Sequence, residues 1–228
     1  MKANSCYLCG SETFEHLVTF PDDPYLKRLS GLKEPSVTYV VCRTCGFVFQ
    51  NPTLEPQELD EMYGEKYRKD LPDEEFISRN TVFTDGRVRW IEEHLGPVPV
   101  LTEGGQAPGG NGSAPGKRVL DVGCGAGVLL NSFKRRGWTV KGVEPTAAYA
   151  EFGSRRFDIP ITPGFFTEAS FPGETFDLIT LSQVLEHATD PGQMLRDCRA
   201  KLGPTGRLFV GVPTLLRPQR PIHVNTLA

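Results

Sequence analysis

The sequence predicts an α/β protein in which a doubly wound parallel sheet follows a small β-rich unit and a helical segment. Beyond about residue 117, short apolar stretches alternate with glycine turns and helical patterns, which is typical of a parallel sheet with helices on both faces. One apolar stretch, residues 119–122, runs directly into three alternating glycines. Near the N-terminus, two Cys-x-x-Cys-Gly motifs stand on either side of a β-prone run, which indicates a separate small unit.

Length and composition set the scale of the protein. The chain has 228 residues and a mass of 25.2 kDa, or about one and a half domains at roughly 150 residues each. A hydrophobic content of 39% and a charged content of 23% are typical of a globular chain. The net charge of -3 provides no general attraction for nucleic acid or an anionic membrane. No signal-peptide core or long apolar run is evident, so we expect a cytoplasmic protein without a membrane span.

Four N-terminal cysteines predict a structural zinc site within a zinc ribbon over residues 1–52. Two tight turns each carry a pair of thiols, and together they supply four sulfur ligands, Cys6, Cys9, Cys42 and Cys45. Such a site has no open coordination position, so it stabilises a fold and does no Lewis-acid chemistry. Disulfides are the alternative, which a reducing cytosol disfavours. A redox role is disfavoured because neither motif opens a helix after a strand.

Residues 53–96 form a predicted helical segment, with helical patterns over 56–67 and 73–95. Gly86 is a point at which the second helix could break, and Gly96 is a stop signal. Residues 97–116 are rich in Gly, Pro and Ser and carry almost no charge, so they predict a flexible linker.

The domain over residues 117–228 supplies the predicted parallel sheet. We expect strands at residues 118–122, 139–143, around 159–161, 176–181 and 207–212, and a helix over residues 128–136. Before the last strand, Asp190 is an N-cap candidate, Pro191 suits the first helical position, and Gly203 marks the helix end. Cys198 falls on the apolar face of this helix and is expected in the core.

The glycine loop predicts a nucleoside-containing ligand. In a doubly wound sheet, the loop after the first strand lies at the switch point where ligands bind, and glycines let the backbone approach them. The pattern G-x-G-x-G places Val128 where a dinucleotide-binding loop requires a small residue, which disfavours a nicotinamide or flavin dinucleotide. Glu144 ends the next strand, a position from which a carboxylate can accept hydrogen bonds from both ribose hydroxyls.

From Val119 to about Val212 the sequence resembles class I S-adenosylmethionine-dependent methyltransferases, which have a Rossmann-like fold. The resemblance rests on residues 120–127, Glu144, the stretch 176–179, and 184–187 followed by Asp190-Pro191. The paired cysteine motifs with residues 47–52 resemble the zinc-ribbon start of a bacterial subfamily associated with sugar or surface-polysaccharide biosynthesis. The resemblance implies methyl transfer to a small-molecule acceptor, with a sugar nucleotide or polysaccharide precursor as the first expectation.

The resemblance also implies a set of cofactor-binding residues. Asp121 and the loop glycines would hold the methionine part, Glu144 the ribose, and Phe165 or Phe166 the adenine. Many relatives have an aspartate at the position of Phe165, so here stacking or backbone groups would replace its hydrogen bond. The complete expected set is Asp121, Gly123, Gly125, Gly127, Glu144, Phe165, Phe166 and Gln183.

His187 is the candidate general base. It follows the fourth strand on the cofactor side. An imidazole, with a pKa of about 6.5, suits proton removal at neutral pH. A packing or capping role is the alternative. Some relatives hold a divalent metal with Glu-x-x-Glu-His; here Gln183 replaces the first glutamate, so no catalytic metal is expected.

Two other functions stay open. Only about sixteen residues follow Val212, with three prolines among them, so the sixth and seventh strands usual for this fold are expected to be missing. That departure admits a degenerate, non-enzymatic binding module. An RNA base methyltransferase is the other alternative, although the net charge opposes it. The sequence does not indicate an oligomeric state.

Overall fold

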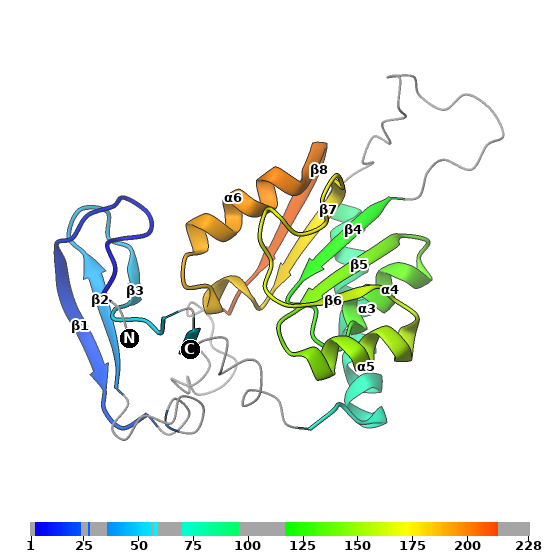
Figure 1. Ribbon diagram of the computed structural model, residues 1–228, viewed down its shortest axis with the longest axis horizontal. Helices are drawn as coiled ribbons and strands as arrows, with labels where there is room; N and C mark the ends of the chain where they lie inside the picture. The colour runs from blue at the N-terminus through cyan, green and yellow to red at the C-terminus, as the bar shows by residue number, and fades with distance from the viewer. Residues whose placement is uncertain are drawn as a thin grey trace. The chain divides into compact units, whose positions relative to one another are not determined.

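The computed structural model describes residues 3–23, 27, 36–55, 57–58, 70–95 and 117–213 (Figure 1). Contacts divide the chain into two compact units. The first comprises Met1–Lys69, Glu186–Gln193 and Thr214–Ala228; the second comprises Asp70–Leu185 and Met194–Pro213. Their described residues form an antiparallel sheet and a parallel sheet respectively.

The first unit contains a three-stranded antiparallel sheet in the order β1-β2-β3. Its strands are β1 (Phe14–Phe20), β2 (Val37–Cys42) and β3 (Val48–Gln50). The β-prone runs of the sequence correspond to β2 and β3, whereas β1 was not predicted. β1 buries no side chain fully and is interrupted by an irregularity between His16 and Val18, so it lacks the strict alternation that identifies a strand.

A long helix, α3 (Glu74–Leu95), belongs to the second unit. It begins after Asp73, whose carboxylate accepts a hydrogen bond from the amide of Phe76 at 2.7 Å. Gly86 does not break the helix. The predicted helix over 56–67, apart from residues 57–58, and the predicted linker over 97–116 lie outside the described residues.

The second unit is built on a five-stranded parallel sheet with the order β6-β5-β4-β7-β8. Its strands are β4 (Arg118–Val122), β5 (Thr139–Glu144), β6 (Ile161–Pro163), β7 (Phe176–Ser182) and β8 (Leu202–Gly211). This arrangement is the predicted doubly wound α/β sheet.

Two predicted boundaries were wrong. β6 begins at Ile161 because the preceding residues close α5, where the amide of Ile159 donates to the carbonyl of Ser154 at 3.2 Å. β8 begins at Leu202, which pairs with Phe176, so Gly203 lies in the strand and does not end the helix. Residues 214–228, on which the expectation about missing strands depends, lie outside the described residues.

Helices cover both faces of the parallel sheet (Figure 1). The helices α4 (Val128–Arg135) and α5 (Ala147–Phe157) join α3 over one core, which contains Ile91, Leu130, Phe133 and Ala150. The helix α6 (Pro191–Lys201) covers the other core and buries Cys198 completely, as expected. The amide of Gln193 donates to the Asp190 carboxylate at 2.8 Å, which confirms the predicted N-cap. No described helix combines the length and apolar character needed to cross a membrane.

Candidate functional site

The glycine loop lies at the point where the sheet order reverses. β5 lies on one side of β4 and β7 on the other, and all three strands are parallel. The carboxyl ends of β4, β5 and β7 therefore meet at one edge, and the loop that follows β4 occupies the position where ligands bind in such sheets.

The loop needs its glycines for conformation and close packing. Gly123, Gly125 and Gly127 have positive φ angles of 65°, 55° and 75°, which side chains with a Cβ disfavour. A Cβ at Gly123 would lie 2.7 Å from a methyl carbon of Val184. The amide of Gly123 donates to the carbonyl of Val143 at 2.8 Å, which holds the loop against the end of β5.

Glu144 ties the ends of β4 and β5 together. Its side chain is 6% exposed; one carboxylate oxygen accepts from the amide of Gly125 at 2.8 Å and the other from the amide of Thr146 at 2.9 Å. A carboxylate oxygen accepts more than one hydrogen bond, so Glu144 retains acceptor capacity for a ligand hydroxyl. The two predicted site residues Gly125 and Glu144 are thus brought into direct contact.

Asp121 is a buried carboxyl group within β4. Burial raises its pKa to about 7, against the opposing effects of a hydrogen bond from Thr180 and the positive charge of Arg87; the charge of Glu144 raises it further. The Thr180 hydroxyl donates to the carboxylate at 2.6 Å. Burial therefore favours the protonated form of Asp121 more than it is favoured in an exposed aspartate.

Sequence reasoning missed Thr180, Arg87 and Ser182. Thr180 contacts Asp121 because β7 pairs with β4 in a register that places these two residues opposite each other. Arg87 reaches the sheet from α3 and donates a hydrogen bond to the Ser182 hydroxyl at the end of β7. Strand register and helix docking are tertiary properties, and no local sequence signal identifies these three residues.

The predicted adenine-binding residues differ in exposure. Phe166 is 8% exposed and packs in the core with Val122 and Val143, whereas Phe165 is 46% exposed. Gln183 follows β7 with a φ of 61°, and its backbone amide donates to the carbonyl of Gly211 at 2.7 Å. Phe165 is therefore the aromatic side chain of this pair that a ligand could reach.

His187 lies in the short 3₁₀ helix η2 (Leu185–His187) and is half-buried. Residues Glu186–Gln193 belong to the first compact unit. Burial raises the pKa of the neighbouring Glu186 carboxyl. The general-base role of His187 stays a prediction.

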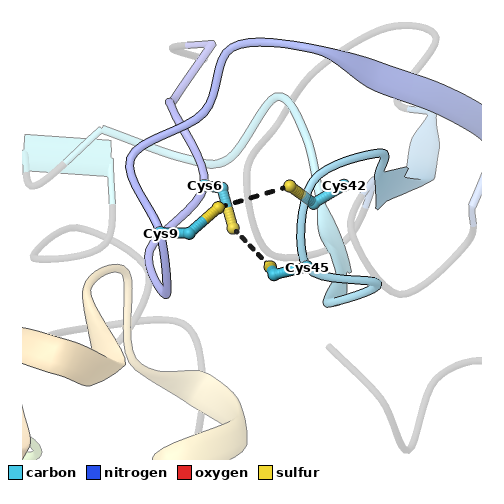
Figure 2. Close-up of side chains that lie close together, drawn as sticks. All are labelled: Cys6, Cys9, Cys42 and Cys45. Atoms are coloured by element: carbon cyan, nitrogen blue, oxygen red, sulfur yellow. Dashed lines mark hydrogen bonds between the residues drawn. The ribbon is translucent and has the colours of Figure 1, made fainter.

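The four N-terminal cysteines gather into one cluster (Figure 2). Their sulfur atoms all lie within 4.8 Å of one another, with 3.6 Å between Cys6 and Cys45 and 3.5 Å between Cys9 and Cys42. A tetrahedral zinc site with bonds of about 2.3 Å has sulfur atoms about 3.8 Å apart, so this donor set fits zinc. Burial raises the pKa of the Cys42 thiol, but the amides of Cys45 and Thr44 and the nearby thiols outweigh it and hold that pKa at about 6.

Curated relatives resemble part of the chain. The ubiquinone biosynthesis O-methyltransferase of Bradyrhizobium sp. (strain ORS 278) is 40% identical over 102 residues, which cover 42% of this chain and 39% of that protein. The protein of the same name from Pseudomonas entomophila (strain L48) is 31% identical over 129 residues, covering 54% and 48%. The matched region thus spans less than half the length of these relatives.

Solved structures also resemble part of the chain. An amino pentose methyltransferase from Micromonospora echinaspora, solved with bound SAM, is 20% identical, with a TM-score of 0.44 and coverage of 68% of this chain and 62% of that one. A family model described as a methyltransferase domain matches residues 107–223, slightly more than half of this chain. The chain belongs to this family of methyltransferase-domain proteins.

Proposed function

We propose that this protein binds S-adenosylmethionine and catalyses methyl transfer to an oxygen atom of a small molecule. The observation that carries the proposal is the hydrogen bond between Gly125 and Glu144, which joins a glycine loop to a carboxylate at the switch point of a parallel sheet. Membership of the methyltransferase-domain family supports the same reaction class.

Each proposed binding residue has a physical role. The positive-φ glycines leave the loop backbone open to close approach by the methionine part, with Asp121 beneath it. Glu144 accepts hydrogen bonds from ribose hydroxyls with its remaining lone pairs. Phe165 stacks on the adenine, and Gln183 contributes a polar side chain at the end of β7.

When bound, S-adenosylmethionine supplies an electrophilic methyl group. The chain's part is to align the acceptor and to remove a proton where the acceptor carries one. We assign proton removal to His187, since it follows β7 and imidazole accepts protons at neutral pH. Asp121, which is buried in β4, joins β4 to β7 through its hydrogen bond with Thr180.

Oxygen is the proposed acceptor atom because the O-methyltransferases that match this chain are 31% to 40% identical to it over the aligned residues. The paired cysteine motifs favour sugar nucleotides among the hydroxyl-bearing acceptors, by their resemblance to the subfamily of sugar-modifying enzymes. We also propose that Cys6, Cys9, Cys42 and Cys45 hold a structural zinc ion, since four closely spaced thiols form a complete ligand set.

A methyl-transfer assay tests the proposal. Zinc-loaded protein is incubated with methyl-labelled S-adenosylmethionine and three acceptor classes: sugar nucleotides, hydroxylated quinone precursors and transcribed RNA. We expect label in a small molecule, loss of transfer in Glu144→Ala, and retention in Glu151→Ala, which removes an exposed glutamate of α5. Label in RNA would contradict the acceptor class. Cofactor binding without transfer to any acceptor would support a binding module and contradict the enzyme.

A further inference from the structure

The outward face of α3 carries large apolar side chains. Ile77, Val88 and Ile91 are buried on the inward face of this helix, whereas Val82, Phe83 and Trp90 are 76%, 61% and 51% exposed. Val82, Gly86 and Trp90 follow one another at intervals of four residues, so they share one face of the helix. An exposed apolar stripe of this kind on a helix is typical of a helix-packing surface.

Gly86, at the centre of this stripe, has no packing requirement among the residues that the structure describes. A Cβ added there would lie within 4 Å of none of their atoms, and the φ of Gly86 is not positive. Glycine in a helix interior weakens the helix relative to alanine. An uncrowded glycine flanked by Val82 and Trp90 instead suits the close approach of a second helix.

The sequence around Gly86 is complementary to itself. In an antiparallel crossing centred on Gly86, positions equally distant from it face each other across a two-fold axis. Arg79 then faces Glu93, and Val82 faces Trp90, whereas Asp85 and Arg87 are engaged within their own chain, with Arg135 and Ser182. Between positions 79 and 93, this pairing places no charged residue opposite one of the same sign.

Trp90 has the features of an anchor for such an interface. Its ring stacks on His94 with centroids 4.1 Å apart and meets Phe209 of β8 edge-on at 6.2 Å, so neighbouring rings hold it in place while half of it stays exposed. Rigid aromatic side chains of this kind dominate the binding energy of protein interfaces.

We propose that α3 is a homodimer interface, in which a second copy of this chain packs antiparallel across Gly86. The partner is a second copy because the charges and apolar residues of α3 match their own two-fold image. The proposal is independent of the methyltransferase reaction.

Sedimentation equilibrium of the full, zinc-loaded chain tests the proposal, from low micromolar to several hundred micromolar protein. We expect the wild type to reach twice its monomer mass of 25.2 kDa. Gly86→Leu should abolish dimerisation while raising the melting temperature of the monomer, because leucine favours a helix and the site has room for it. This stabilisation separates loss of the interface from loss of the fold.

A charge exchange tests the predicted register. Arg79→Glu and Glu93→Arg each create two like-charge contacts across the axis, so each variant alone should dimerise roughly tenfold more weakly. An equimolar mixture of the two variants should recover association, because opposite charges then meet at both contacts. Arg199→Glu, an exposed arginine on α6, is the matched control and should dimerise like the wild type.

A wild type that stays monomeric throughout the range would overturn the proposal. So would a dimer that Gly86→Leu and the single charge variants leave unchanged, since its interface would lie elsewhere on the chain.

Discussion

A buried carboxyl group lies in β4, the strand that leads into the loop that we propose binds the cofactor. Asp121 is 2% exposed, and burial raises its pKa to about 7 despite the hydrogen bond from Thr180 and the charge of Arg87. An unfolded chain releases this proton near pH 4. The folded protein therefore binds one more proton than the unfolded chain between about pH 4 and pH 7.

Asp121→Asn should change the pH dependence of stability. Because the wild type loses the extra proton as pH rises, its free energy of unfolding falls by up to about 1.4 kcal/mol per pH unit across this window. The variant has no carboxyl group to titrate at this position, so its stability does not fall in this way. Its free energy of unfolding relative to the wild type should therefore increase from pH 4 to pH 7. Urea unfolding at several pH values measures this difference; a constant difference would show that Asp121 ionises normally.

Gly123→Ala should destabilise the second unit more than Gly173→Ala. Both residues have a positive φ, 65° and 74°, but a Cβ at position 123 would lie 2.7 Å from Val184, whereas a Cβ at position 173 would have no described atom within 4 Å. Backbone strain alone costs about 1–2 kcal/mol, and the contact adds to it. Urea unfolding compares the two variants, and equal losses would contradict the packing of the loop against Val184.

Among the elements, the small antiparallel sheet depends most on its cysteines. The core around the sheet contains Cys6, Val40, Cys42 and Phe49 as its buried members, so two of the four are proposed zinc ligands. A three-stranded sheet with so small a core is marginal without a further stabilising element. Metal binding would then supply much of the folding free energy of this sheet.

Zinc removal should unfold β1–β3 and leave the parallel sheet folded. Hydrogen exchange before and after chelation measures this: amides of β2 should lose protection, whereas amides of β4 and β7 should keep it. Cys42→Ser should reproduce the loss without a chelator, and Cys198→Ala, which removes a buried cysteine outside the cluster, should retain zinc. Full protection of β2 in zinc-free protein would contradict a structural role for the metal.

The elements that the sequence predicts well are those with strong local signals. β4 matches its predicted bounds because an apolar run ends at a glycine loop, and α6 begins where Asp190 caps it. The first strand, β1, was missed because none of its side chains is fully buried and because cross-strand pairing holds it. The start of β8 was misplaced because pairing with Phe176 extends the strand through Gly203.

For the molecule as a whole, the sequence predicts the parts of the candidate site but not the contacts between them. The glycine loop and Glu144 were identified from spacing, and the sheet order places them at one edge. The contacts of Asp121 with Thr180 and of Arg87 with Ser182 arise from strand register and helix docking, which residue patterns do not encode locally. The exposed stripe of α3 was likewise visible only once its buried face was known.

The central claim is that the edge formed by β4 and β5 binds the adenosine-containing cofactor through Glu144. Calorimetric titration of the zinc-loaded protein with S-adenosylhomocysteine tests it most directly. We expect one binding site in the wild type and in Glu151→Ala, with affinity reduced at least tenfold in Glu144→Ala, equivalent to about 1.4 kcal/mol for lost charge-assisted hydrogen bonds. Equal affinity in Glu144→Ala, or no binding by the folded wild type, would contradict the claim.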